Sequence, residues 1–248
     1  MSDLLKKLVL DVHTHTLASG HAYGTIRENV EAAKERGMLL YGHSEHGPGV
    51  PGTCEPIYFS CFPRLPRFIS GMEVVCGAEL NVNNGGGFDF PENLFKCLDY
   101  ALVGIHFYKD EGREANTDNV ISCMKHEKVF FVSHPDSDFT PLNYERLVQA
   151  AKENHVALEL NNSSFRKQSS RLNCVENYRT MLRLCREYGT YILVSTDAHD
   201  PSEVGDFTEA AEFLEEQEFP EELILNTSVE KFKEFIHYRQ EKDYGMKK

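Results

Sequence analysis

Histidine and carboxylate side chains stand at the ends of several apolar segments of this chain. The stretch LVLDVHTHTLASGHAYG, residues 8–24, places three histidines within nine residues, and comparable residues follow in HSEHG, GAELN, GIHFY, VSHPD and STDAH. This pattern selects seven histidines and two carboxylates: His13, His15, His21, His46, Glu79, His106, His134, Asp197 and His199. Imidazole nitrogen and carboxylate oxygen are donors that divalent transition metals take in proteins. Nine donors exceed the needs of one tetrahedral ion, so the pattern predicts a centre of two or three divalent cations.

Each candidate taken singly has a simpler interpretation. A lone histidine such as His134, or a lone glutamate such as Glu79, is more often a hydrogen-bonded polar residue than a metal ligand. The pair His13 and His15 is more specific, because a period of two turns both rings to one side of a strand. The shared position of the nine at strand ends favours metal binding. The other four histidines are assigned to solvent or packing: His43, His126, His155 and His237.

Alternating strands and helices must position these residues. Runs of β-branched and aromatic residues predict seven strands, over 8–13, 39–43, 74–80, 100–106, 129–134, 156–160 and 191–196. Parallel strands joined by crossover helices bring their carboxyl ends to one mouth, so residues far apart in sequence meet there. The chain is therefore predicted to be α/β, a single seven-stranded TIM-like barrel domain over residues 1–248.

Helix signals fall between the predicted strands. Thr25 and Glu28 form a capping box for one helix, and Thr140 with Pro141 predicts the N-cap and first turn of another. Further helices are predicted over 174–189, 206–217 and 227–240. The last of these carries its apolar side chains on one side: Phe232, Phe235 and Ile236.

The segment 47–72 interrupts this rhythm. It holds five prolines among glycines and aromatic residues, which predicts a long loop inserted after the second strand. Such a loop serves as a lid or substrate wall, or it is a surface excursion, and the sequence favours neither.

Composition limits the class of protein. The chain has 248 residues, 41% of them hydrophobic, with 26 basic residues against 39 acidic ones and a formal charge of −13. This charge repels an extended phosphate backbone, so a nucleic-acid partner is disfavoured. Seven cysteines without a CxxC pair fit reduced thiols, and no apolar run reaches the roughly 18 residues of a membrane span. The sequence predicts a soluble, cytoplasmic protein without a membrane partner, and a homo-oligomer is compatible with it.

The ordered motifs of this chain resemble those of the PHP family of metal-dependent phosphoesterases, whose name joins polymerase and histidinol phosphatase. They are DVHTHTLASGHAYGT, GHSEHGPG, GAELN, GIHF, SHPD, LELNNSSF and STDAH. The similarity extends from Leu8 to about Asn226 and is greatest to small stand-alone bacterial phosphatases with a trinuclear centre in a distorted seven-stranded barrel. Carried over position by position, it implies three metal sites: His13, His15, Glu79 and Asp197; bridging Glu79 with His106 and His134; and His21, His46 and His199. One position departs from the family pattern, since Glu45 stands where aspartate usually precedes the histidine, which alters a contact behind a ligand or substrate.

The resemblance implies hydrolysis of small phosphomonoesters, with histidinol phosphate as a candidate substrate. A metal-activated hydroxide is expected to attack phosphorus without a protein nucleophile, and the sequence leaves the general acid open. The expected cofactors are three divalent transition metal ions, zinc first and manganese or iron as alternatives. The expected partner is a small phosphorylated metabolite, which Asn161 and Arg166 are predicted to contact. A solvated loop with a helix cap is the simpler interpretation of that segment.

Other functions share part of this pattern. Amidohydrolase-type barrels cleave C–N bonds and typically carry a bridging carboxylated lysine at the fourth strand, where this chain has His106. Its carboxylate, Glu79, lies one strand earlier, which favours the phosphoesterase. A non-catalytic metal-binding module would retain the same ligands, and turnover of an aryl phosphate would separate it from an enzyme. A nuclease or proofreading role would need a basic track, which the net charge disfavours.

Overall fold

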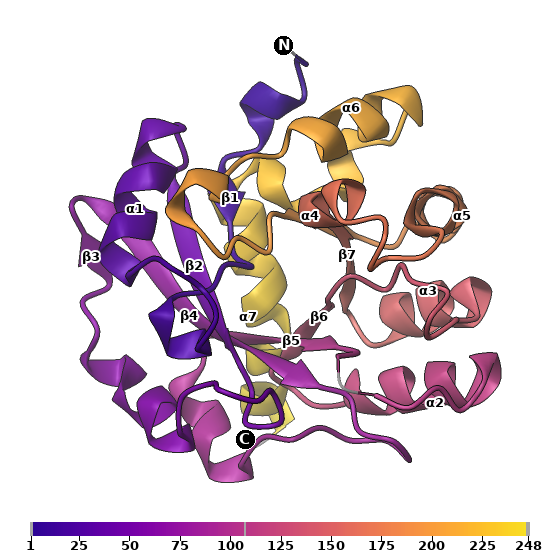
Figure 1. Cartoon of the computed structure of the whole chain (residues 1–248), viewed down its shortest axis with the longest axis horizontal. Coiled ribbons are helices and arrows are strands. Elements are labelled where there is room, and N and C mark those ends of the chain that lie inside the picture. Colours follow the sequence, from indigo (N-terminus) through magenta and orange to yellow (C-terminus); the bar gives the residue numbers. More distant parts are fainter. Residues whose placement is uncertain (1, 107, 247–248) are drawn as a thin grey trace.

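Seven parallel strands form one sheet that curls into a nearly closed barrel (Figure 1). The computed structural model describes residues 2–106 and 108–246, and the side chains of 2–106 and 108–238. The strands follow one another along the sheet as β1 (Leu10–Asp11), β2 (Leu40–His46), β4 (Met72–Asn81), β5 (Tyr100–Gly104), β6 (Val129–Val132), β7 (Ala157–Asn161) and β8 (Ile192–Ser195). A short strand, β3 (Phe68–Ile69), pairs antiparallel with β4. The predicted fold class, a single α/β domain with a seven-stranded TIM-like barrel, is confirmed.

Side chains close the gap between β8 and β1, because within the described residues these two strands share no ladder. The Asn226 side chain accepts a hydrogen bond from Val194 N (2.7 Å) and donates to the carbonyl oxygens of Leu10 (2.9 Å) and Val194 (2.7 Å). Buried Asp11 accepts a hydrogen bond from the Thr196 hydroxyl (2.5 Å). These contacts join β1 to β8, and a backbone bridge between Thr14 and Ala198 holds the loops that follow them side by side.

Helices form an outer layer around the barrel (Figure 1). They are α1 (Ile26–Glu35), α2 (Arg113–Cys123), α3 (Tyr144–Glu153), α5 (Cys174–Tyr188) and α6 (Thr208–Glu216). The short α4 (Asn162–Arg166) follows β7, and α7 (Val229–Met246) crosses the bottom of the barrel. Short 3-10 helices also occur between these elements: η1 (Leu5–Lys7), η2 (Leu17–Ser19), η3 (Pro56–Arg64), η4 (Glu92–Cys97), η5 (Pro201–Glu203), η6 (Glu221–Leu223) and η7 (Leu225–Thr227). In the part of the chain that the structure describes, no helix has the length and apolar character needed to cross a membrane.

The start of α1 follows its predicted capping chemistry. Glu28 N donates a hydrogen bond to Thr25 Oγ1 (3.3 Å), and Thr25 N donates to Glu28 Oε2 (2.8 Å), which confirms the capping box. Helices α2 and α4 lie outside the predicted set. The buried side of α2 is partly polar, with Asn116, Thr117 and Asn119, so its apolar periodicity is weak.

The start of α3 corrects a prediction. Thr140 and Pro141 do not begin the helix, which starts at Tyr144. The Asn143 side chain caps it instead by accepting a hydrogen bond from Arg146 N (3.3 Å). Asparagine caps at least as well as threonine, and here it satisfies an N–H group of the first turn that has no partner inside the helix.

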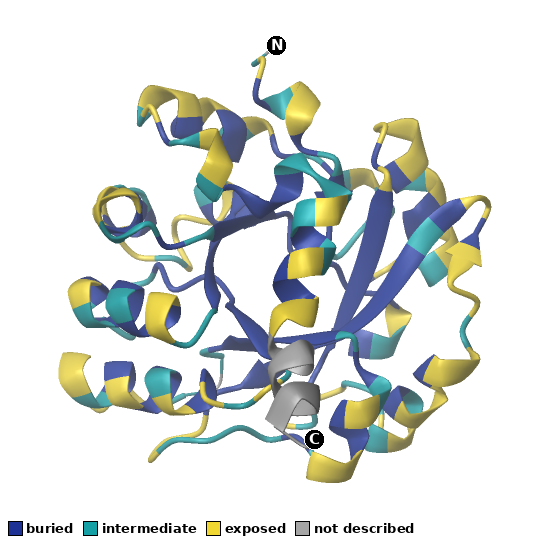
Figure 2. Cartoon of the chain, turned by 180° about the vertical axis from the view of Figure 1, so that it is seen from behind, coloured by how far each residue is buried: buried dark blue, intermediate teal, exposed yellow. Residues whose placement is uncertain are grey.

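The lower end of the barrel is filled by apolar side chains. The inner cluster includes Leu10, Leu40, Tyr100, Leu102 and Phe131 from the strands and Val12 just after β1. Helix α7 covers this cluster from below with Phe232, Phe235 and Ile236, which confirms its predicted apolar side (Figure 2). The candidate metal ligands lie at the opposite end, the mouth.

The segment 47–72 contains η3 and β3 rather than being entirely irregular. Phe59 and Phe62 of η3 are buried, and the Phe59 ring packs edge-to-face on Phe90 at 5.0 Å between centroids. The segment therefore packs on the barrel between β2 and β4 without an α-helix, as does the β4–β5 crossover, which contains η4. A role as lid or substrate wall stays a prediction.

Candidate metal centre

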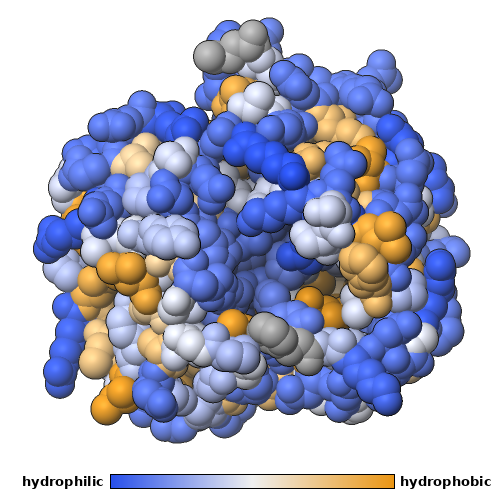
Figure 3. Space-filling view, in the orientation of Figure 1, coloured by the Kyte–Doolittle hydropathy of each residue, from blue (hydrophilic) through white to orange (hydrophobic). Residues whose placement is uncertain are grey.

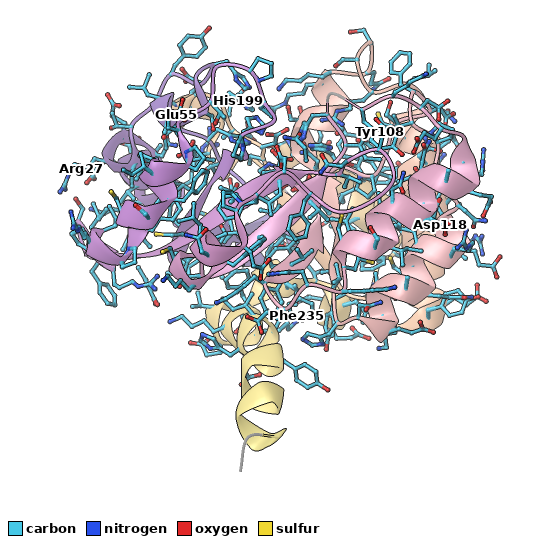
Figure 4. The ribbon with its side chains drawn as sticks, turned by 90° about the horizontal axis from the view of Figure 1, so that it is seen from below. Arg27, Glu55, Tyr108, Asp118, His199 and Phe235 are labelled. Carbon is cyan, nitrogen blue, oxygen red and sulfur yellow. The ribbon has the colours of Figure 1, made fainter. Side chains whose placement is uncertain are left out.

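The strands project the candidate side chains into one mouth. Figure 4 shows His199 at the mouth and Phe235 on α7 beneath the barrel. Strands β2 and β4 carry ligands within the ladder, and their register pairs His46 with Glu79. The other candidates lie in the loops after β1, β5, β6 and β8: His13, His15, His21, His106, His134, Asp197 and His199. Figure 3 shows a hollow lined by hydrophilic residues at the centre of this face.

Glu79 lies at the centre of the cluster. Its Oε2 is 3.2 Å from His13 Nε2, 3.5 Å from His15 Nε2 and 3.0 Å from His46 Nδ1, and its Oε1 is 3.2 Å from His106 Nε2 and 2.9 Å from His134 Nε2. Among the described residues neither oxygen has a hydrogen-bond partner, although the side chain is fully buried. A buried carboxylate without hydrogen bonds is costly unless positive charge lies beside it. Burial raises the pKa of Glu79, but the charges of His106 and His13 outweigh it and hold this pKa well below 4.5.

Asp197 completes a second side of the cluster with His13 and His15. Asp197 Oδ1 is 3.1 Å from His15 Nε2 and 3.5 Å from His13 Nε2, and the two Nε2 atoms are 3.2 Å apart. His13 Nδ1 faces Glu159 Oε1 at 2.5 Å, and His15 Nδ1 faces Ser19 Oγ at 3.0 Å. Because the Ser19 proton goes to another carboxylate, both Nδ1 atoms face acceptors, and each ring in its neutral form presents its lone pair at Nε2. Lone pairs and carboxylate oxygens converge on one point, so these residues fit a divalent cation.

The electrostatics of this point favour positive charge. Burial lowers the pKa of His13, yet Glu159, Glu79 and Asp197 raise it well above 6.5. Burial, helped by neighbouring imidazoles, lowers the pKa of His15 to about 3, so this ring is neutral and able to donate a lone pair at pH 7. Burial raises the pKa of Asp197, but His13 and His15 hold it well below 3.8. A metal that binds here must displace the His13 proton, which makes its affinity dependent on pH.

The candidate donors form three groups, and within each group the donor atoms lie within 4.8 Å of one another. The groups are His13, His15, Glu79 and Asp197; His46, Glu79 and His106; and His15, His46 and His199. The first is one of the groups implied by the family resemblance. His21 and His134 stand beside these groups, His21 Nε2 at 3.1 Å from His199 Nε2 and His134 Nε2 against Glu79. The structure therefore brings all nine predicted residues into one cluster. Their division into three sites stays a proposal.

Two of these residues have left-handed backbone conformations. The φ angle is 28° at His134 and 51° at Asp197, and neither residue is glycine. Such conformations cost on the order of 1–3 kcal/mol and persist where the surrounding structure imposes them, which is common at functional sites.

Glu159, on β7, is a buried carboxylate behind the cluster and is not among the predicted site residues. Its Oε1 accepts hydrogen bonds from His13 Nδ1 (2.5 Å) and Ser195 Oγ (2.5 Å), and its Oε2 accepts from His134 N (2.6 Å) and Asn161 Nδ2 (3.2 Å). Burial raises its pKa, but the His13 charge outweighs burial and keeps the pKa below 4.5. Carboxylates of this kind fix the tautomer of a ligating histidine. The available sequence signal was an acidic residue within an apolar strand.

Glu45 supports two candidate ligands from behind. Its carboxylate accepts hydrogen bonds from Thr16 N (3.1 Å), Thr16 Oγ1 (2.6 Å) and Ser19 Oγ (2.6 Å). Ser19 Oγ in turn lies 3.0 Å from His15 Nδ1 and accepts a hydrogen bond from His46 N at 3.2 Å. The position that departs from the family pattern thus anchors the loop after β1 to the end of β2.

The four histidines assigned to packing or solvent lie outside the cluster. His43 is fully buried on β2. His126 and His155 stack on phenylalanine rings, and His237 is exposed on α7.

A polar hollow of about 270 Å³ opens beside the cluster. Its lining includes the candidate ligands His106 and Asp197 together with Asn161, Lys167 and Arg171. The Asn161 amide donates a hydrogen bond to Asp197 Oδ2 (3.3 Å), and its Oδ1 has no partner among the described residues. The hollow therefore places two cations and an amide next to the donor cluster.

Arg166 takes a different direction from the predicted one. Its guanidinium donates hydrogen bonds to Glu209 Oε1 (2.6 Å) and Asp206 Oδ2 (2.9 Å). Arg171, five positions later, is the arginine that borders the hollow. Sequence alone could not separate the two, because both lie in the same segment after β7.

Fold and site together define a barrel metallohydrolase with a histidine-rich mouth. Protein-family models give no match to the chain. Relatives named probable phosphatase match nearly its whole length. One from Thermoanaerobacter sp. (strain X514) is 38% identical over 243 residues, which cover 96% of this chain and 98% of the relative. Another from Clostridium novyi (strain NT) is 37% identical over 233 residues, which cover 93% of this chain and 95% of the relative. The chain belongs to the PHP family of metal-dependent phosphoesterases. It is a hydrolase, a metal-dependent phosphatase.

Solved structures share the fold at low identity. Histidinol phosphate phosphatase from Lactococcus lactis subsp. lactis Il1403, solved with zinc, L-histidinol and phosphate, has a TM-score of 0.62 and 18% identity, covering 86% of this chain and 95% of that one. A chain of archaeal ribonuclease P with mature tRNA has a TM-score of 0.59 and 14% identity, covering 96% and 93%. At these identities the likeness establishes the barrel fold alone.

Proposed function

We propose that this protein hydrolyses small phosphomonoesters at a centre of three divalent transition metal ions. The observation that carries the proposal is the environment of Glu79, a fully buried carboxylate that five imidazole nitrogens approach at 2.9–3.5 Å. Divalent ions bound there would supply Lewis acidity and lower the pKa of bound water to near neutrality. Mixed imidazole and carboxylate donors suit zinc, manganese and iron, and the zinc in the Lactococcus lactis neighbour supports zinc as the first ion to test.

The proposed division of ligands follows the family resemblance. The first site comprises His13, His15, Glu79 and Asp197, the second comprises Glu79, His106 and His134, and the third comprises His21, His46 and His199. Glu79 is the bridge between the first two sites, because its two oxygens face different histidines. Outer hydrogen bonds hold the rings in place: Glu159 on His13, Ser19 on His15 and Asn81 on His106.

The polar hollow is the proposed seat of the substrate. A phosphoryl group placed between the cluster and the hollow would meet Arg171 and Lys167, and the planar guanidinium can donate paired hydrogen bonds to two phosphoryl oxygens. Asn161 offers an amide whose Oδ1 has no partner among the described residues. Asn161 and Arg171 are therefore the proposed substrate contacts. Arg166 would contact the substrate only after its guanidinium leaves Glu209 and Asp206.

The geometry supports phosphate chemistry over C–N bond hydrolysis. The carboxylate that five imidazoles approach is Glu79 itself, so a carboxylate already stands where an amidohydrolase-type barrel would need a carboxylated lysine. Cations in the adjoining hollow suit an anionic substrate better than a neutral amide.

The test is turnover by metal-replete protein on a panel of phosphomonoesters that includes histidinol phosphate, with amides and cyclic ureas as the rival panel. Phosphate release should stop on chelation and return with zinc, manganese or iron(II). Glu79→Gln is the inactive comparison, and Glu212→Gln, an exposed change on α6, is the matched control. Cleavage restricted to amides would move the chain to the rival class. A fully loaded protein that turns over neither panel would be a metal-binding module.

A further inference from the structure

In five of the candidate histidines, one ring nitrogen is turned away from the cluster, and the partner of this nitrogen shows where the ring proton lies. In four rings this nitrogen faces an oxygen acceptor: His13 Nδ1 faces Glu159 Oε1 (2.5 Å), His15 Nδ1 faces Ser19 Oγ (3.0 Å), His106 Nδ1 faces Asn81 Oδ1 (2.6 Å) and His199 Nδ1 faces Asp197 O (2.8 Å). The Asn81 amide is oriented by its own hydrogen bond to Asp89, so its oxygen faces the ring. A neutral imidazole with its proton on Nδ1 presents the Nε2 lone pair. These four rings are arranged to bind metal through Nε2.

His134 differs from these four rings. Its Nδ1 lies 2.9 Å from Arg171 Nη1. A guanidinium carries donors only and keeps its charge in proteins, so Nδ1 must accept and the proton of a neutral ring lies on Nε2. Nε2 is also the atom that lies 2.9 Å from Glu79 Oε1. With this partner, His134 offers no lone pair to the cluster.

Arg171 has a second anionic partner and an open side. Its Nη1 is 3.7 Å from Asp136 Oδ1, and neither oxygen of this buried carboxylate has a hydrogen-bond partner among the described residues. Asp136 and His134 line the same small cavity, so the carboxylate is an acceptor available to a His134 Nδ1–H. Arg171 also borders the polar hollow, where its side chain is 21% exposed.

We infer that Arg171 competes with metal for the His134 imidazole, and that its release from His134 turns the guanidinium toward an anion in the polar hollow. The inference rests on the proposed function, in which His134 is a ligand of the second site. During the exchange the His134 proton leaves Nε2 and a proton is taken up at Nδ1, so the ring stays neutral and Asp136 accepts the new hydrogen bond. Arg171 thus acts as a positioning residue in one state and as an anion-binding group in the other.

The coupling works in both directions. An anion held by Arg171 removes the competing donor from His134 and so tightens metal binding, and linkage requires metal loading to tighten anion binding by the same factor. A substrate phosphate would then bind more tightly to metal-loaded protein than to metal-free protein, and this gain in affinity would be separate from direct contact between phosphate and metal.

The proton position can be observed directly. Long-range ¹H–¹⁵N correlation spectra of histidine-labelled, metal-free full-length protein report which ring nitrogen of His134 carries hydrogen. The expected result is a proton on Nε2 in wild type and a move to Nδ1 in zinc-loaded protein. In metal-free Arg171→Met the Nδ1 form should gain population. A wild-type spectrum with the proton already on Nδ1 before loading would overturn the inference.

Metal titration supplies the second readout. Competition against a chromogenic zinc chelator should show the second zinc bound about tenfold more tightly by Arg171→Met than by wild type, since the competing charged hydrogen bond is lost. Lys167→Met is the matched control, because it removes a cation from the same hollow without touching a candidate ligand. Inorganic phosphate should tighten zinc binding in wild type, and less in Arg171→Met.

Equal gains in affinity for the second zinc in Arg171→Met and Lys167→Met would overturn the inference, because they would reflect loss of positive charge alone. Unchanged zinc affinity in Arg171→Met would overturn it as well. Failure of the proposed function looks different: wild type would bind at most one zinc, or His134→Ala would leave all zinc binding unchanged.

Discussion

Replacing Glu159 with glutamine would test how far the carboxylate behind the cluster controls the ligands. Its two oxygens receive donors only: His13 Nδ1 and Ser195 Oγ at Oε1, and His134 N and Asn161 Nδ2 at Oε2. Glutamine keeps the shape of the side chain but changes one acceptor oxygen into an NH2 donor.

The orientation of the new amide follows from which donors can adapt. The backbone N–H of His134 is a fixed donor, whereas a serine hydroxyl can rotate and the His13 ring can shift its proton. The NH2 group should therefore take the Oε1 position. His13 would then accept at Nδ1 and carry its proton on Nε2, the atom 3.2 Å from Glu79 Oε2. The first site loses its lone pair and a charge-assisted hydrogen bond of about 1.5–3 kcal/mol, so metal affinity there should fall by about 10–100-fold.

The assay is competition for zinc against a fluorescent chelator at constant pH, with the phosphomonoesterase rate measured on the same samples. Glu212→Gln, exposed on α6, should stay within about twofold of wild type. Histidine-labelled spectra should show the His13 proton on Nε2 in metal-free Glu159→Gln. A variant with wild-type zinc affinity would refute the reasoning, because the hydrogen bond from His13 Nδ1 would then have no part in preparing the ligand.

Three further outcomes are expected. Glu79→Gln should weaken the first and second sites together, leave the third less affected and lower turnover by orders of magnitude; metal analysis and crystallography of the variant check this, and retention of all metals would remove Glu79 as the bridge. Burial lowers the pKa of His43, but Cys76 and Glu45 raise it from 6.5 to about 9, so its stabilisation of about 3 kcal/mol is present below pH 6.5 and is lost as pH rises through 9. In denaturant unfolding of metal-free protein, the free energy of unfolding should fall more over that pH window for wild type than for His43→Gln. Equal pH dependence in the two proteins would contradict the raised pKa of His43. Asn226→Ala removes three buried hydrogen bonds across the β8–β1 seam and should cost about 3–5 kcal/mol, seen as a drop in Tm of about 10 °C with the strand content retained; an unchanged Tm would mean that the seam is held by other contacts.

Local sequence patterns were sufficient to predict the fold class and the residue types of the candidate site. The period of two in His13 and His15, the apolar runs before each ligand and the capping box at Thr25 depend on neighbours in sequence, so they could be interpreted without the tertiary structure. The barrel rule then placed residues 13 to 199 at one mouth, since parallel strands put all their carboxyl ends together. The fold class was confirmed, and the structure brings the nine predicted residues together.

Tertiary structure decided the features that depend on distant partners. Glu159 reaches His13 across 146 positions, and Asn226 joins strands that begin at Leu10 and Ile192. Arg171 rather than Arg166 borders the hollow because Arg166 meets acidic residues of another element. Period and propensity describe how a residue relates to its near neighbours in the chain, whereas a buried polar group must find its hydrogen-bond partner in space. The residue types of the candidate ligands were therefore visible in the sequence, whereas the hydrogen-bond partners of their rings depend on packing.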